Sequence, residues 1–168
     1  MRKASLVLLL SGFSALLGQG PTQKDLVPYS WQYKATVHGT ILVPPGYKAE
    51  TENYVEGIIT YLRYPDSSYI VLQHGGMYRV PMLQDPEYLI NKTEDRADRV
   101  VRTGYIKGSE KLWREDNLKR QPLDRLSRNQ RLHPYPYLFP PNIAYDKVPK
   151  DKCDLFNKAL NSFDWRKQ

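Results

Sequence analysis

Hydrophobic and polar residues alternate in short runs along most of the chain, and turn-forming residues separate these runs. Residues 31–43, WQYKATVHGTILV, mix β-branched and aromatic side chains without a proline, which predicts a first strand. The following segment, PPGYKAETE at 44–52, opens with two prolines and a glycine and is expected to form a turn and a loop. This part of the chain is typical of a β-rich domain.

A three-strand meander is predicted over residues 54–82. Residues 54–64 alternate partly, residues 69–73 (YIVLQ) are apolar and β-branched, and residues 77–82 (MYRVPM) continue the pattern. The PDSS run at 65–68 has the proline and the short polar side chains of a turn, and the glycine pair at 75–76 is a hairpin signal. We therefore expect 69–73 to be a central strand and the polar corners to reverse the chain.

Further strands are predicted at 98–106, 111–117 and 142–148, with the KGSE turn at 107–110 between the first two. The long segment 118–141 shows no strand periodicity and is expected to be a loop or a partly ordered excursion. A C-terminal helix starting at Asp151 is predicted from apolar residues near the helical period. They are Cys153, Leu155, Phe156, Leu160 and Phe163.

These elements predict an α+β fold: a mainly antiparallel, twisted sheet of five to seven strands with the C-terminal helix packed on one face. A helix-free β-barrel is the alternative. The expected organisation is a signal peptide at 1–18, a flexible lead-in at 19–30 and one domain at 31–168 that carries the excursion at 118–141.

The N-terminus predicts export. Arg2 and Lys3 precede an apolar run at 4–18 that ends in small residues, which is the pattern of a cleaved secretory signal. The alternative, a membrane-spanning helix, needs about 20 apolar residues, and three serines interrupt this shorter run. The protein is therefore expected to be periplasmic, cell-surface or secreted, without a transmembrane segment after cleavage.

Charge and composition exclude several classes of function. The formal charge of +7 falls to +5 when Arg2 and Lys3 leave, which is mildly basic, and no nucleic-acid motif is present, so nucleic acid is not an expected partner. A single cysteine, Cys153, excludes an internal disulfide. Three histidines and one cysteine do not make a usual zinc site, and the signatures of nucleotide cofactors are absent, so no metal or cofactor is expected.

One hypothesis for catalysis combines His74 with a carboxylate of Glu115 or Asp116. A histidine beside a carboxylate can act as a general base in a small hydrolase or lyase, because its pKa lies near neutrality. The serines at 67–68 cannot serve as its nucleophile, because they lie at the other end of one predicted strand, about 20 Å away. The alternative is that His74 is a polar residue at a strand end.

A binding hypothesis centres on Tyr78, Trp113 and Arg114. Trp113 could form the stacking floor of a cleft and Arg114 an anion clamp. The alternative is ordinary strand alternation, with Leu112 and Arg114 on one face, Trp113 and Glu115 on the other, and ion pairs to the next strand.

The basic segment 118–132 is a second candidate surface. Apart from Lys119, its positive residues are Arg120, Arg125, Arg128 and Arg131, against one acid, Asp124. Such a surface could bind a polyanion, for example an anionic glycan, or it could be a solvated loop. The run HPYPYLFPP at 133–141 either offers a polyproline II ligand or covers a sheet edge or face, and we favour the covering role.

Two short matches at the ends of the domain resemble exported proteins of the PsbP/Mog1-like class. Pro45, Gly46 and Tyr47 match its turn after an early strand, and Ser162 and Phe163 match the end of its last helix. The resemblance implies an α/β/α-like sandwich and a binding or accessory role, with no catalytic residue to transfer, and the excursion at 118–141 departs from it. The middle of the chain resembles exported bacterial proteins of unassigned function.

Three functions are therefore predicted, in this order. The first is a non-enzymatic exported binding or accessory module at the cell envelope, with an envelope protein or an anionic glycan as partner. The second is a small hydrolase or lyase that uses His74. The third is a cell-surface polyanion binder that uses the basic segment 118–132.

Overall fold

In the computed structural model, the described residues form three parts: a seven-stranded sheet, a two-stranded sheet and a C-terminal helix. The structure describes residues 26–33, 37–54, 57–75, 85–119 and 140–165. In this part of the chain every strand pairing is antiparallel. The predicted fold class, an antiparallel α+β sheet with a C-terminal helix on one face, is confirmed.

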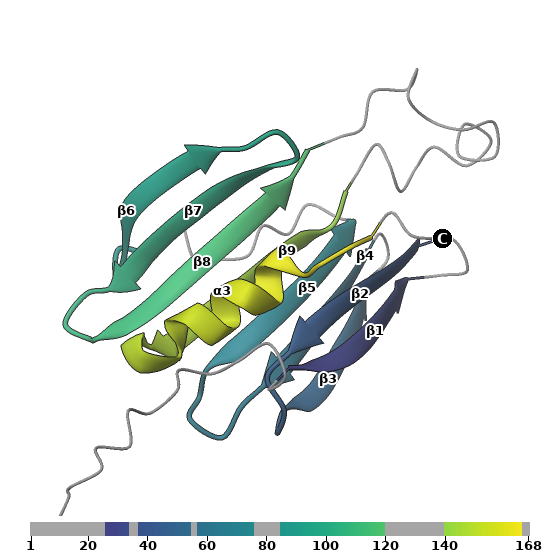
Figure 1. Ribbon diagram of the computed structural model, residues 1–168, viewed down its shortest axis with the longest axis horizontal. Coiled ribbons are helices and arrows are strands. Elements are labelled where there is room, and N and C mark those ends of the chain that lie inside the picture. The colour runs from purple at the N-terminus through teal and green to yellow at the C-terminus, as the bar shows by residue number, and fades with distance from the viewer. Residues whose placement is uncertain (1–25, 34–36, 55–56, 76–84, 120–139, 166–168) are drawn as a thin grey trace, which may run out of the picture.

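The large sheet has the strand order β3-β4-β5-β9-β8-β7-β6. It therefore consists of two local meanders, β3-β4-β5 and β6-β7-β8, with the last strand of the chain inserted between them (Figure 1). The strands are β1 Val27–Tyr33, β2 Val37–Val43, β3 Lys48–Tyr54, β4 Gly57–Arg63, β5 Tyr69–Gly75, β6 Tyr88–Asp95, β7 Arg99–Ile106, β8 Lys111–Leu118 and β9 Asn142–Pro149.

The hairpin β1–β2 and the helix lie side by side over one face of the large sheet (Figure 1). A backbone bridge between Thr40 and Asp164 joins the hairpin to the residues after the helix. This face contains the main core, because alternate residues of β4, β5 and β9 point toward the hairpin and the helix. Its largest members are Trp31, Tyr145, Phe156, Phe163 and Trp165.

The helical segment begins later than the sequence suggests. A 3₁₀ turn, η4, spans Lys150–Lys152, and the α-helix, α3, spans Cys153–Asn161. Asp151 lies inside the 3₁₀ turn and no side chain caps the start of α3, so the expected capping role of Asp151 is wrong. The apolar stripe is confirmed at Phe156 and Leu160, which are buried against the sheet.

Several strand predictions need correction. Residues 31–43 belong to two strands, and β1 begins at Val27, within the expected lead-in. Residues 48–52, expected to be part of a loop, lie on the edge strand β3, and β6 is not predicted from the sequence. Residues 69–73 are central, as predicted, but their neighbours are β4 and β9. The meander is therefore β3-β4-β5, and the predicted strand at 77–82 lies outside the described residues.

The predicted turn at residues 65–68 is confirmed. The amide of Ser67 donates to the carbonyl of Tyr64 at 3.1 Å, and the amide of Ser68 donates to Asp66 Oδ1 at 3.0 Å. Lys152 Nζ donates to Asp66 Oδ2 at 2.5 Å and so ties the turn to η4. Partial burial raises the pKa of Asp66, but the hydrogen bonds from Lys152 and Ser68 outweigh it and lower the pKa from 3.8 to about 2.

Replacing Asp66 with asparagine should destabilise the protein by about 1 kcal/mol near neutral pH. Because the folded state lowers this pKa, the contribution is complete above the unfolded value of 3.8 and disappears as the pH falls through about 2. Urea unfolding of wild type and Asp66→Asn across this range should show the two stabilities converging. Asp85→Asn, in another turn, is the control, because an amide oxygen can still accept the backbone bond from Glu87. A difference that is constant with pH would contradict the prediction.

Candidate functional site

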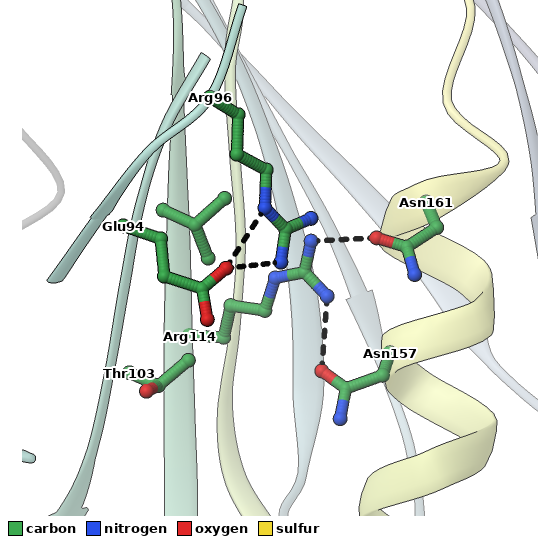
Figure 2. Close-up of a pocket in the computed structure, with 7 residues that line it drawn as sticks. Glu94, Arg96, Thr103, Arg114, Asn157 and Asn161 are labelled. Carbon is green, nitrogen blue, oxygen red and sulfur yellow. Dashed lines mark hydrogen bonds and ion pairs between the residues drawn. The ribbon is translucent and has the colours of Figure 1, made fainter. Parts of the chain in front are cut away.

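A polar cavity of about 290 Å³ lies between α3 and the strands β6, β7 and β8 (Figure 2). We call it the arginine pocket, because two arginines, Arg114 on β8 and Arg96 just after β6, line it together with two asparagines of the helix. Its lining residues are Glu94, Arg96, Val101, Thr103, Arg114, Asn157 and Asn161.

Strand register brings the sheet residues of the pocket together. Thr103 pairs with Arg114 across β7 and β8, and Glu94 pairs with Val101 across β6 and β7. Directly paired residues of antiparallel strands point to the same face, which here is the face covered by α3. A bulge between residues 90 and 92 shifts the register of β6 and so sets which of its residues point to this face.

The helix contributes Asn157 and Asn161, which are four residues apart and therefore lie on one side of α3. Arg114 Nη1 donates to Asn157 Oδ1 at 3.0 Å, and Arg114 Nη2 donates to Asn161 Oδ1 at 2.7 Å (Figure 2). Asn157 is held from its other side by the hydroxyl of Tyr145 at 3.2 Å and by Cys153 Sγ at 3.3 Å. The two amides therefore fix the guanidinium of Arg114 against the helix.

Arg114 also belongs to a buried ionic cluster with Arg99 and Asp116. Asp116 is 0% exposed and accepts from Arg114 Nε at 2.6 Å, Arg114 Nη2 at 2.8 Å and Arg99 Nη1 at 3.0 Å. Burial lowers the pKa of Arg99, but its bonds to Asp98 and Asp116 outweigh this, and the net pKa is raised. One carboxylate therefore serves two guanidinium groups.

The outer rim of the pocket is formed by Glu94 and Arg96. Arg96 donates to Glu94 Oε2 from Nε at 3.0 Å and from Nη2 at 2.7 Å (Figure 2). Lys92 pairs with Glu94 Oε1. The hydrogen bonds from Lys92 and Arg96 lower the pKa of Glu94 to about 2. Glu94 is therefore a carboxylate at any physiological pH. Arg96 uses two of its five N–H groups in these bonds.

Of the residues in the catalytic hypothesis, His74 and Glu115 lie on opposite faces of the sheet, whereas Asp116 lies on the same face as His74. The pairing of β5, β9 and β8 places His74 on the face covered by α3 and Glu115 on the opposite face. Glu115 pairs with Arg102 at 3.5 Å, and both oxygens of Asp116 accept from arginines. His74 is buried against Trp31, with 6.2 Å between the ring centroids.

Arg114 is the predicted binding residue that lines the pocket. Trp113 points to the other face, is fully buried, and packs edge-on against Tyr88 with 6.3 Å between the ring centroids. It therefore offers no exposed floor beside Arg114. The other predicted binding residues lie outside the described residues: Tyr78, Arg120, Arg125, Arg128 and Arg131.

The sequence interpretation missed Glu94, Arg96, Thr103, Asn157 and Asn161. One signal was available: two asparagines four residues apart in an otherwise amphipathic helix, a spacing that places both amides on one side. The other three lie on or beside strands whose register the sequence does not give.

A second polar group lies on the face opposite α3, around Asp146. Asp146 is 0% exposed and accepts from the hydroxyl of Tyr88 at 2.9 Å. Burial and this carboxylate raise the pKa values of Tyr88 and of its neighbour Tyr69. Arg63 lies over the rings of Tyr61 and Tyr69, at 4.6 and 5.6 Å from their centroids. These contacts partly bury the tyrosines of this face.

Comparison with known proteins gives no match: no protein-family model, no curated protein and no solved structure matches the chain. The resemblance of the chain ends to the PsbP/Mog1-like class therefore stays a prediction. Within the described ranges, no group of three or more histidine, cysteine or acidic residues could hold a metal ion. The one α-helix of those ranges, α3, is too short to cross a bilayer.

Proposed function

We propose that the protein is a non-enzymatic, exported binding or accessory module of the cell envelope, and that its ligand enters the arginine pocket. The proposal rests on the position of Arg114, a nearly buried arginine that lines the cavity in a fixed orientation. Its side chain is 3% exposed, yet it lines a cavity, and four hydrogen bonds to Asp116, Asn157 and Asn161 fix its orientation. A charged group that is held in place before the ligand arrives loses little conformational entropy on binding.

Binding is favoured over catalysis by the arrangement of the titratable groups. The pocket is lined by arginines, amides, a hydroxyl and Glu94, whose pKa is lowered to about 2, and no histidine or cysteine, the usual general acids and bases near neutral pH, is among its described lining residues. The hydrolase or lyase that would use His74 is not favoured, since Glu115 lies on the opposite face and both carboxylate oxygens of Asp116 accept hydrogen bonds from Arg99 and Arg114. Polyanion binding through Arg120, Arg125, Arg128 and Arg131 remains a prediction.

The cavity volume of about 290 Å³ is at the lower end of the range for small-molecule sites. The ligand group that enters it is therefore small, of the size of one sugar unit or one organic acid. Export is inferred only from the amino-acid sequence of residues 1–18. These residues lie outside the part of the chain that the structure describes.

The proposal is tested by thermal unfolding with a panel of small polar probes: glucuronate, glucose, glucose 6-phosphate, malonate and glutamate. A ligand that binds only the folded state raises the midpoint of unfolding. At least one probe should do so for wild type, and Thr103→Phe, which fills the cavity from β7, should abolish the shift.

Thr93→Phe is the matched control. Thr93 is exposed on the neighbouring strand β6, pairs with Arg102 on the other face and does not line the pocket. It should keep the probe-induced shift of the wild type. A shift that survives in Thr103→Phe, or no shift with any probe, would count against the pocket as the binding site.

A further inference from the structure

Two guanidinium groups, those of Arg96 and Arg114, line the same small cavity (Figure 2). Each arginine has five N–H donors. Four donors of Arg114 and two of Arg96 are used in hydrogen bonds to the described residues. One N–H of Arg114 and three of Arg96 therefore remain for an acceptor that enters the pocket.

The charges around the pocket do not balance. Four positive and three negative side chains are joined by ion pairs in this region, so the group as a whole carries a net charge of +1. They are Lys92, Arg96, Arg99 and Arg114 against Glu94, Asp98 and Asp116. Like charges that line one cavity repel each other, and an anion between them removes part of this repulsion.

From these two observations we propose that the pocket binds the carboxylate group of a small ligand, between Arg96 and Arg114. This proposal rests on the pocket's being the binding site, as proposed above, and it adds the chemistry of the ligand. A planar carboxylate accepts two N–H groups from one guanidinium or one from each of two. Its single negative charge equals the surplus of the pocket.

The remaining lining residues favour a monoanion over a phosphate. Glu94 is ionised at the rim, because its pKa is lowered to about 2, and it repels a dianion more strongly than a monoanion. Thr103 and Asn161 are neutral. The Oδ1 of Asn161 accepts from Arg114, so its amide N–H groups are turned toward other acceptors, such as ligand hydroxyls.

Three probes with the same sugar ring separate the possible chemistries: glucuronate, glucose and glucose 6-phosphate, titrated into the full-length protein by calorimetry. Glucuronate should bind more tightly than both of the others, and its affinity should fall with added salt. Arg96→Gln should weaken the binding of glucuronate about tenfold or more, because it removes charge-assisted hydrogen bonds.

Arg63→Gln is the matched control for charge. Arg63 is exposed to 46% and Arg96 to 42%, and each pairs with one exposed glutamate, but Arg63 lies on β4, outside the pocket. This variant loses the same charge and should leave the affinity for glucuronate unchanged. An equal loss in both variants would overturn the inference, since it would show a general effect of net charge.

The outcomes distinguish this inference from the proposed function. Equal binding of glucose and glucuronate, or tighter binding of glucose 6-phosphate, overturns the carboxylate inference and leaves the pocket as the binding site if Thr103→Phe abolishes the binding. Binding of glucose without binding of glucuronate, malonate or glutamate overturns it as well. If Thr103→Phe changes the binding of none of the probes, both proposals fail.

Discussion

Replacing Asp116 with alanine is expected to lower the free energy of unfolding by about 3–5 kcal/mol, which is a large part of the stability of a domain of this size. Asp116 is fully buried and accepts three hydrogen bonds from Arg99 and Arg114. Without it, two guanidinium groups remain in the interior with less than their full set of partners, and the cost of their desolvation is no longer offset.

Chemical denaturation, followed by tryptophan fluorescence, measures this loss. Two variants separate the charge effect from packing. Asp116→Leu combined with Arg114→Met removes both charges at similar volume and should be more stable than Asp116→Ala. Glu50→Gln breaks ion pairs that lie in solvent on β3 and should leave the transition unchanged. If the double variant were less stable than Asp116→Ala, the buried charges would not be the cause.

Gly104→Ala is expected to destabilise the protein by more than about 3 kcal/mol or to prevent folding, because overpacking at a backbone contact cannot relax. A Cβ atom at Gly104 would lie 1.9 Å from the carbonyl oxygen of Leu89 and 2.7 Å from the indole ring of Trp113. The first neighbour is backbone of the adjacent strand, so β6 would have to move away from β7.

Gly39→Ala is the graded control for this prediction. Its nearest neighbours are atoms of the Phe163 ring, at 3.0 and 3.2 Å, and a side chain can turn where a backbone cannot. Its loss of stability, measured by thermal unfolding and circular dichroism, should be clearly smaller. A Gly104→Ala protein that unfolds at the wild-type temperature would show that β6 does not lie against β7 as described.

The strands that the sequence predicted are those with one buried face. Residues 98–106, 111–117 and 142–148 show clear alternation or apolar runs, and the structure confirms them within two residues as β7, β8 and β9. The hairpin β1–β2 was read as one strand, because the sequence between its strands, Lys34 to Thr36, contains neither glycine nor proline.

The two missed strands share a physical cause. β3 and β6 are the edges of the large sheet, and most of their residues are exposed. A strand that buries neither face has no reason to alternate hydrophobic and polar residues, so its sequence reads as a loop. The NKT sequence at residues 91–93, which suggests a polar loop, lies on β6.

The pocket was less predictable than the fold. The sequence singled out Arg114 as an anion clamp, and Arg114 does line the cavity, but its expected companion Trp113 points to the opposite face because neighbouring residues of a strand alternate. The other lining residues meet through the register of β6, β7 and β8 and through the position of α3. These are long-range relations, which local sequence patterns do not contain.

The insertion of β9 between β5 and β8 has a consequence for the order of assembly. Each three-stranded meander joins neighbours in sequence and can form early, but the sheet is incomplete until the strand nearest the C-terminus arrives. Until then β5 and β8 each present an unpaired edge, that of β5 rich in apolar residues, and such edges recruit strands from other chains. We therefore expect refolding to be slow and to depend on protein concentration, because the sheet is completed only when its last strand, β9, pairs with β5 and β8.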